Sequence, residues 1–331
     1  MEPTTIAGKP VVSIKRKSVI NMKSGFVHKL LCDGPTFSMG DSCVFSCSFC
    51  YVEAQALKDV AIQQALAPLG KPLGEVVIRR ENALAILREQ LTQGGRPRFA
   101  DPTDKRVIYA SPLVDVAGNM DLVRETIDAC HIILSLTNWH IRLLSKSSLL
   151  TKVAEALAEH RDRMIYGFST GTLSDEMTKV FECGTALASK RVKALHQLQD
   201  AGFRTFGMIC PSLPQRDYDD FAGQQAEALR VDQCEHVWAE VLNERGESLA
   251  RTVKGLADGG FDFEANALAA VGIDQERWEA YARATFEAHA QNIPDGKLRF
   301  LQYVTKSTVG WWADRKSQGA VLLGQAAETS I

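Results

Sequence analysis

Strands and helices alternate through the middle of the sequence, and this pattern restricts the possible folds more than any other feature. Runs rich in β-branched and aromatic residues predict strands at 106–110, 140–145, 164–169, 204–210 and 235–242. Apolar residues at helical spacing predict helices at 122–136, 148–158, 190–201 and 221–229. Such alternation is typical of βαβ units around a parallel sheet. With one more strand expected before Cys43, the pattern predicts six strands, fewer than a closed eight-stranded barrel needs.

The alternation stops after residue 242. Helices are predicted at 248–257, 264–270 and 275–291, followed by a strand at 298–305. Nearer the start, we expect one helix over 52–67, a strand at 76–78 and a helix over 83–91, after a basic run at 15–17. We therefore predict an N-terminal basic arm (1–34), an α/β domain (35–245) and a mainly helical C-terminal subdomain (246–331).

The composition is that of an ordinary globular protein. The chain has 331 residues, of which 45% are hydrophobic and 24% are charged, and its net charge of −2 does not favour bulk binding of polyanions. No run of eighteen apolar residues is present, and the start lacks the pattern of a signal peptide. We therefore expect a cytoplasmic protein that does not enter membranes. Five of the eight cysteines are scattered and are expected to be thiols.

The other three cysteines, Cys43, Cys47 and Cys50, lie in one short stretch. Three thiolates at this spacing can reach one inorganic core, and thiolates are the ligands of iron–sulfur clusters. A four-iron cluster held by three thiolates keeps one iron open for another ligand. The alternative is a zinc site, but a structural zinc needs a fourth ligand and usually a second ligand pair, and the sequence has no second Cys-x2-Cys.

The predicted strand ends supply further candidate site residues, because barrel-type α/β proteins carry their chemistry at the carboxyl ends of the strands. These residues are Ser111, Lys146, Ser169, Cys210, Glu240 and Asn243. Lys146 can offset the charge of a cluster or bind an anionic group, and its alternative is a solvent-facing lysine. Cys210 can donate hydrogen to a carbon radical, and its alternative is a buried thiol.

The pattern Cys-x3-Cys-x-aromatic-Cys, with Phe49 as the aromatic residue, resembles the signature loop of the radical S-adenosylmethionine (SAM) enzymes. The resemblance implies a partial (β/α)6 TIM-like barrel with a [4Fe-4S] cluster whose open iron binds SAM. It also implies reductive cleavage of SAM to a 5′-deoxyadenosyl radical, which takes hydrogen from the substrate. An electron donor such as flavodoxin or ferredoxin is the implied partner.

Several stretches resemble the spore photoproduct lyase branch of these enzymes, also described as DNA repair photolyase-like. They are Phe168-Ser169, Phe181-Glu182-Cys183-Gly184-Thr185, Arg191, Arg142 to Lys146, Asp115 to Gly118, Gly207 to Pro211 and Leu301-Gln302-Tyr303. The resemblance covers residues 35–245 best. It implies that Ser111, Lys146 and Ser169 contact SAM, and Tyr51 is placed with these cofactor-binding residues.

The sequence departs from this branch in one respect. The lyase carries a hydrogen-donating cysteine on the strand that here ends at Tyr109-Ala110-Ser111-Pro112, where no cysteine is present. We therefore expect a relative with a different substrate. A nucleic acid or nucleotide is the first substrate hypothesis, and a peptide or small metabolite is the second. A non-catalytic iron–sulfur or zinc module is the third reading.

The C-terminal tail contains the remaining candidates for substrate contact, Trp311, Trp312, Arg315 and Lys316. Indole rings can stack on bases, and the flanking cations suit phosphate groups. In the alternative, the tryptophans pack the tail onto the domain and the cations are solvated.

Overall fold

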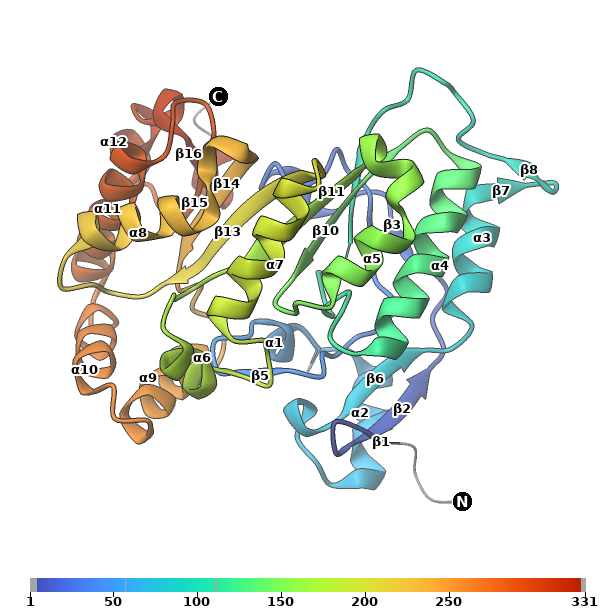
Figure 1. Ribbon diagram of the computed structural model, residues 1–331. Coiled ribbons are helices and arrows are strands. Elements are labelled where there is room, and N and C mark those ends of the chain that lie inside the picture. The colour runs from blue at the N-terminus through green and yellow to red at the C-terminus, as the bar shows by residue number, and fades with distance from the viewer. Residues whose placement is uncertain (1–4, 57, 111, 329–331) are drawn as a thin grey trace. The chain divides into compact units, whose positions relative to one another are not determined.

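The computed structural model describes residues 5–56, 58–110 and 112–328 (Figure 1). The chain forms two compact units. The first contains Met1–Ser46 and Cys50–Tyr166, and the second contains Cys47–Phe49 and Gly167–Ile331. The division into 1–34, 35–245 and 246–331 that the sequence predicts stays a prediction.

The first unit contains a four-stranded part of a sheet, in the order β10-β9-β4-β3. Its strands are β3 (Ile20–Asn21), β4 (Thr36–Phe37), β9 (Val107–Ala110) and β10 (His140–Ser145). The pairs β4–β9 and β9–β10 are parallel, with Ile141 opposite Ile108, whereas β3 and β4 are antiparallel. The strand expected before Cys43 is therefore β4, which is short because the chain leaves the sheet to form the cysteine loop.

Helices of the first unit lie side by side in Figure 1. They are α3 (Ala83–Leu91), α4 (Met120–Leu136) and α5 (Leu150–Ala156), and a 3-10 helix, η4 (Ala158–Arg163), follows α5. The side chain of Asn119 begins α4 by accepting hydrogen bonds from the backbone N–H groups of Asp121 (2.9 Å) and Leu122 (3.0 Å). Ala129 and Ile133 are fully buried on one face of α4. The apolar spacing that predicted this helix is therefore the spacing of its core contacts.

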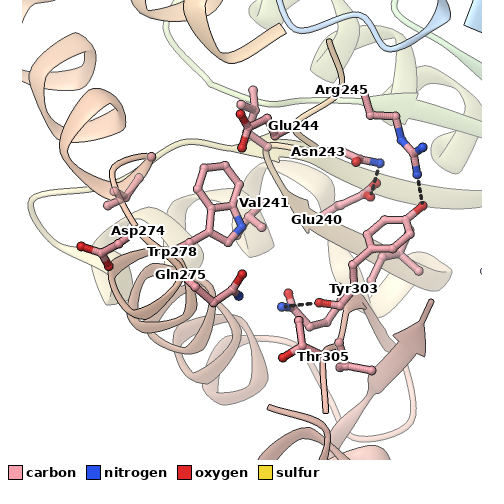
Figure 2. Close-up of a pocket in the computed structure, with 16 residues that line it drawn as sticks. Glu240, Val241, Asn243, Glu244, Arg245, Asp274, Gln275, Trp278, Tyr303 and Thr305 are labelled. Carbon is pink, nitrogen blue, oxygen red and sulfur yellow. Dashed lines mark hydrogen bonds between the residues drawn. The ribbon is translucent and has the colours of Figure 1, made fainter. Parts of the chain in front are cut away.

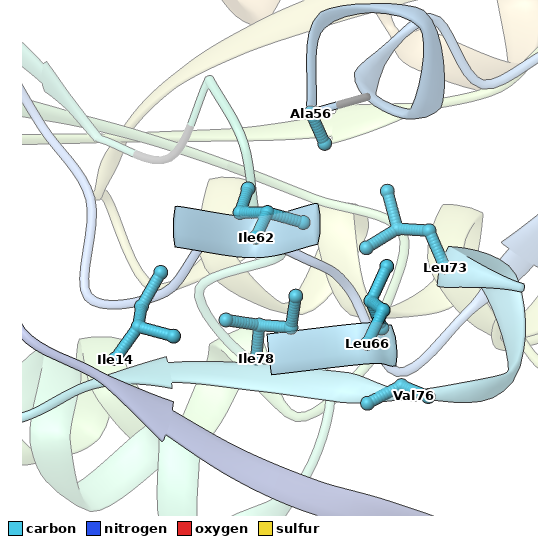
Figure 3. Close-up of a cluster of buried hydrophobic side chains, with 7 residues drawn as sticks. All are labelled: Ile14, Ala56, Ile62, Leu66, Leu73, Val76 and Ile78. Carbon is cyan, nitrogen blue, oxygen red and sulfur yellow. The ribbon is translucent and has the colours of Figure 1, made fainter. Parts of the chain in front are cut away.

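A second, three-stranded sheet of this unit is formed by β1 (Thr5–Ile6), β2 (Lys9–Ile14) and β6 (Val77–Arg80), with α1 (Val52–Ala56) and α2 (Val60–Leu66) nearby in the chain. Its apolar cluster contains Ile14, Ala56, Ile62, Leu66, Leu73, Val76 and Ile78 (Figure 3). Part of the predicted N-terminal arm is thus a strand with a core of its own.

The single helix expected over 52–67 is wrong. Two helices are present, because Asp59 starts a new one by accepting hydrogen bonds from the backbone N–H groups of Ala61 (2.9 Å) and Ile62 (3.3 Å). The same carboxylate forms an ion pair with Arg16 at 2.8 Å. The capping aspartate competes with continuation of the first helix, and helix propensity alone did not reveal this.

In the second unit, four parallel strands follow the order β16-β15-β14-β13. They are β13 (Arg204–Ser212), β14 (Cys234–Val241), β15 (Leu298–Tyr303) and β16 (Ala320–Leu323). Met208 lies opposite Trp238, and Phe300 lies opposite Ala320. β15 and β16 therefore extend the sheet of β13 and β14, and the C-terminal segment is not only helical. β11 (Met164–Ser169), whose six residues are all buried, crosses the division between the units.

The helices of the second unit are α6 (Asp175–Phe181), α7 (Ala188–Asp200), α8 (Tyr218–Leu229), α9 (Ser248–Asp258), α10 (Asp262–Val271), α11 (Gln275–Asn292) and α12 (Val309–Ala313). Phe181 of α6, Leu256 of α9 and Leu268 of α10 share one buried cluster with Leu213 and Leu242, which follow β13 and β14. The three helices predicted after residue 242 agree with α9, α10 and α11 to within two residues at each end.

Short elements complete the chain. They are β5 (Ser46–Cys47), β7 (Thr92–Gln93), β8 (Arg96–Pro97), β12 (Glu182–Cys183), α13 (Gln325–Glu328), η1 (Gly25–Val27), η2 (Ala67–Leu69), η3 (Leu73–Glu75), η5 (Val231–Gln233) and η6 (Lys316–Gln318). The α/β class and the parallel pairing of the strands are confirmed, and closure into a partial barrel stays a prediction. Within the described ranges, no helix combines the length and the apolar character that crossing a membrane requires.

Candidate functional site

The cysteine loop carries three half-buried cysteines, none of which is in a disulfide. Cys43 and Cys50 belong to the first unit, and Cys47 belongs to the second. Burial of the Cys43 thiol raises its pKa to about 12, and the negative charges of Asp115 and Cys50 act in the same direction. A thiol with a raised pKa is a poor free nucleophile, whereas three neighbouring cysteines form a donor set that suits a metal cluster.

Close packing holds the loop within the first unit. A Cβ atom on Gly118 would lie 2.8 Å from Cγ1 of Val44, so the loop rests directly on the backbone there. The backbone N–H of Phe45 points to Sγ of Cys43 at 3.5 Å. The hydroxyl of Tyr51 donates to the carbonyl oxygen of Pro112 at 2.5 Å, just after the end of β9. Tyr51 therefore anchors the end of the loop.

Residues 47–49 are fixed by contacts within the second unit. The backbone N–H of Ser48 donates to the carbonyl oxygen of Phe181 at 2.9 Å, and its hydroxyl donates to Oγ1 of Thr252 at 3.2 Å. Nε of Arg251 donates to the carbonyl oxygen of Ser48 at 3.1 Å. The aromatic residue of the cysteine motif, Phe49, packs on Phe181 with ring centroids 5.4 Å apart. Phe49 is thus a structural part of the loop.

Asp115 connects the surroundings of Cys43 to the end of β10. Its carboxylate accepts hydrogen bonds from the hydroxyl of Ser145 (2.7 Å) and from the backbone N–H groups of Lys146 and Ala117 (both 2.8 Å). Burial raises the pKa of Asp115, and these three hydrogen bonds oppose that rise. The structure thus brings Asp115 close to Cys43 and to the backbone of Lys146.

Asp115 was not among the site residues predicted from the sequence, although the stretch that it begins was noted. The signal that could have identified Asp115 is its position as an acidic residue shortly after the end of the strand β9. Lys146 is half-buried at the carboxyl end of β10. Ser111, the other candidate on this side, lies outside the described residues.

In the second unit, four of the predicted residues form a hydrogen-bonded row. The hydroxyl of Ser169 donates to the carbonyl oxygen of Cys210 at 3.2 Å, and Sγ of Cys210 lies 3.8 Å from Oε2 of Glu240. Nδ2 of Asn243 donates to Oε1 of Glu240 at 3.3 Å. The row crosses the carboxyl ends of β11, β13 and β14, as the rule of strand ends predicts.

A buried ion pair supports one end of this row. Arg191 of α7 and Glu182 are both 0% exposed and contact each other through a short hydrogen bond. Arg191 also donates to the carbonyl oxygen of Ser169. The guanidinium therefore fixes the end of β11. The sequence had marked both residues only through their resemblance to the lyase branch.

A hollow of about 520 Å³ opens beside Glu240 and Asn243, as Figure 2 shows. Its lining residues come from three segments of the chain: 240–245, 271–278 and 301–305. The indole ring of Trp278, from α11, lies among these segments in Figure 2. Nη2 of Arg245 donates to the hydroxyl of Tyr303 at 3.3 Å. The hollow thus offers two aromatic side chains and several hydrogen-bonding groups.

The charges around this hollow are unequal. Glu240, Glu244 and Asp274 are its carboxylates, and Arg245 is its guanidinium. Sequence reasoning had found Glu240 and Asn243 but not Trp278, Tyr303, Arg245 or Asp274. No local pattern joins segments so far apart, although Tyr303 had been noted in a motif of the lyase branch.

Of the four tail candidates for substrate contact, Trp312 is packed in the core. Trp312 is 0% exposed, donates from Nε1 to Oε1 of Glu279 at 2.6 Å and stacks on Phe300. The guanidinium carbon of Arg315 lies 3.5 Å from the centre of the Trp311 ring. Of the residues that the structure describes, Trp311, Trp312, Arg315 and Lys316 are not in the lining of the hollow. These contacts favour the packing alternative for Trp312.

Solved structures of spore photoproduct lyase share the architecture of this chain. One has a TM-score of 0.58 and 13% sequence identity, over 88% of this chain and 81% of that chain. Another, complexed with dinucleoside spore photoproduct, has a TM-score of 0.55 and 13% identity over the same shares. A third, with bound AdoMet and dinucleoside spore photoproduct, has a TM-score of 0.52 and 14% identity, over 82% of this chain and 77% of that chain.

The chain shares the fold of spore photoproduct lyase. This likeness confirms, at the level of the fold, the resemblance to spore photoproduct lyase that the sequence motifs indicated. A curated relative, the uncharacterized protein ORF301 of Acidianus two-tailed virus, is 22% identical over 240 residues, 71% of this chain and 76% of the relative. No family model matches the sequence. On this fold, chemically active side chains gather at the cysteine loop and along the row from Ser169 to Asn243.

Proposed function

We propose that this protein is a radical SAM enzyme in which Cys43, Cys47 and Cys50 hold a [4Fe-4S] cluster and S-adenosyl-L-methionine is the cofactor. The observation that carries the proposal is a three-cysteine loop on a spore photoproduct lyase-like fold, with Cys43 beside Asp115. When bound, the cluster and SAM supply the reducing electron and the radical that removes hydrogen from the substrate.

On the cofactor side, we assign Lys146 to the carboxylate of SAM. Asp115 holds the backbone N–H of Lys146 at 2.8 Å and so positions the base of that side chain. A charge-assisted contact of this kind adds specificity as well as affinity. Ser169, Tyr51 and Ser111 complete the proposed SAM-side residues, and Ser111 is assigned from the sequence alone.

On the substrate side, Cys210 is the proposed hydrogen donor. The Cys210 S–H bond breaks, a C–H bond forms on the substrate radical, and a thiyl radical remains on Cys210. One electron from the reductant and one proton from solvent then restore the thiol. Sγ lies 3.8 Å from Oε2 of Glu240, so the carboxylate orients the thiol. A flavodoxin- or ferredoxin-type donor is the proposed source of electrons.

The first proposed substrate is a nucleic acid or nucleotide. Support comes from the fold shared with lyase structures whose bound ligand is a dinucleoside spore photoproduct, and from Trp278 and Tyr303, on which a base can stack. The second candidate is a peptide or small metabolite that carries an amine. The charges favour it, because Glu240, Glu244 and Asp274 repel phosphate and attract a cation.

The remaining parts of the proposal concern the whole molecule. We propose that 35–245 forms the partial (β/α)6 barrel, and that 1–34 and 246–331 extend it. The three-thiolate loop suits the reducing cytoplasm, which we propose as the compartment.

Anaerobic reconstitution with iron, sulfide, reductant and SAM tests the proposed function. We expect about four irons per chain and release of 5′-deoxyadenosine, which a non-catalytic module would not produce. Nucleosides and oligonucleotides deuterated on base or sugar then test the substrate. Deuterium in 5′-deoxyadenosine identifies direct abstraction from that substrate. If only a peptide or an amine-bearing metabolite stimulates SAM cleavage, the second candidate replaces the first.

A further inference from the structure

Two histidines and a glutamate converge in the first unit, in elements that the proposed function does not use. One ligand atom from each of His131, Glu159 and His160 lies within 4.8 Å of the others. His131 is on α4, and the other two residues are on η4. We propose that these side chains form a metal site for a divalent transition metal of the Zn²⁺ class.

The donor set suits this class of ion. Two imidazoles and one carboxylate are common zinc ligands, at bond lengths of about 2.0–2.2 Å. The ligand atoms of a tetrahedral site with such bond lengths lie about 3.4 Å apart. The three ligand atoms here lie within 4.8 Å of one another, so each pair must approach by about 1.4 Å or less when the ion binds. Nε2 of His160 already lies 3.5 Å from Oε1 of Glu159. A water molecule can complete the fourth position.

The backbones beneath these ligands are held in place. Nη1 of Arg163 donates to the carbonyl oxygen of Leu134 at 3.1 Å, and Nη2 donates to that of Thr137 at 2.8 Å. These bonds join the end of η4 to the end of α4. Ile133 and Leu157, which flank the ligands in sequence, are both 0% exposed and anchor the two elements in the core. Ligands on rigid elements keep their geometry when the ion arrives.

An open hollow of about 690 Å³ gives an ion access to this place. His131 and His160 are among its lining residues, together with Asp128 and Ser135 of α4 and Arg88 of α3. Asp128 lies one helical turn before His131, so it adds a second carboxylate on the same face of α4. In the lining of the hollow, the charge of Asp128 offsets that of Arg88, and Glu159 adds a carboxylate beside His160.

Calorimetric titration with Zn²⁺ tests the proposal. The full-length chain is used with Cys43, Cys47 and Cys50 replaced by serine, because the thiolates would otherwise compete for the ion. We expect one Zn²⁺ per chain, with affinity at least about tenfold weaker in His131→Ala and in Glu159→Gln. His28→Ala is the matched control, because His28 is also exposed and belongs to the same unit, and it should leave the affinity unchanged.

Two further measurements keep the test decisive. Co²⁺ in place of Zn²⁺ should give the intense visible absorption of a four-coordinate ion, which His131→Ala should remove. His131 is exposed, so its replacement should leave the circular dichroism spectrum unchanged. Equal Zn²⁺ affinity in His131→Ala and the parent, or no binding above background, would overturn the metal site without affecting the radical SAM proposal.

Discussion

The surroundings of Cys43 and the row from Ser169 to Asn243 are built in opposite ways. Around Cys43, the thiol of a half-buried cysteine lies close to Asp115, and the contacts come from short segments next to two strand ends. The row in the second unit ends at a 520 Å³ hollow whose walls come from three distant segments. Under the proposed function, the first region holds the cofactor and the second meets the substrate.

This difference indicates which part of the protein its relatives should share. A cluster and SAM impose the same geometry in every enzyme that uses them, so a small set of residues around one loop suffices. Substrate recognition needs shape and charge from many directions, which only the packing of α11 and β15 near β14 provides. The missing cysteine at the end of β9 and the presence of Cys210 on β13 fit a changed substrate side.

Replacing Cys43, Cys47 and Cys50 together by alanine should have the largest effect. Without the three thiolates, no ligands remain for the cluster, so the brown absorbance and 5′-deoxyadenosine formation should both disappear. Iron analysis after anaerobic reconstitution measures this. Cys183→Ser is the matched control, because Cys183 is also half-buried but lies outside the loop. Retention of about four irons by the triple variant would contradict the assignment.

Arg191→Met tests the support of the second region. The change leaves the carboxylate of Glu182, which is 0% exposed, without its buried partner. Removal of one member of a buried ion pair typically costs about 3–5 kcal/mol, so the free energy of unfolding should fall by that amount in urea titration. Lys190→Met, at the exposed neighbouring position, should leave it nearly unchanged. An equal loss in both variants would show that the ion pair is not the cause.

Lys146→Ala tests the first region without removing the cluster. The charge-assisted contact that it loses is worth about 1.5–3 kcal/mol, so SAM binding should weaken roughly ten- to a hundred-fold. Equilibrium binding of SAM to the reconstituted enzyme measures the change, and iron content should stay at the parent level. Lys152→Ala provides the matched control, because Lys152 is an exposed lysine in the same unit. Unchanged SAM affinity in Lys146→Ala would place Lys146 among the solvent-facing lysines.

Glu240→Gln should have the smallest effect and should act only on the substrate side. The amide keeps the shape of the side chain but removes the charge that orients the Cys210 thiol, so substrate turnover should fall about tenfold, a loss of about 1.4 kcal/mol. SAM cleavage without substrate and SAM affinity should not change. Cys210→Ala should change the product distribution in the same assay. Normal turnover and products in both variants would return Cys210 to the buried-thiol alternative.

The sequence by itself determined the cysteine loop and many of the longer strands and helices. These depend on ligand spacing and on apolar periodicity, which are local properties, and the predicted strands at 140–145 and 164–169 match β10 and β11. The tertiary structure decided which distant groups meet. It placed Asp115 close to Cys43, Glu240 beside Cys210, and Trp312 in the core against Glu279. Contacts between segments far apart in the chain depend on how strands and helices pack, and a single sequence carries no local signal for them.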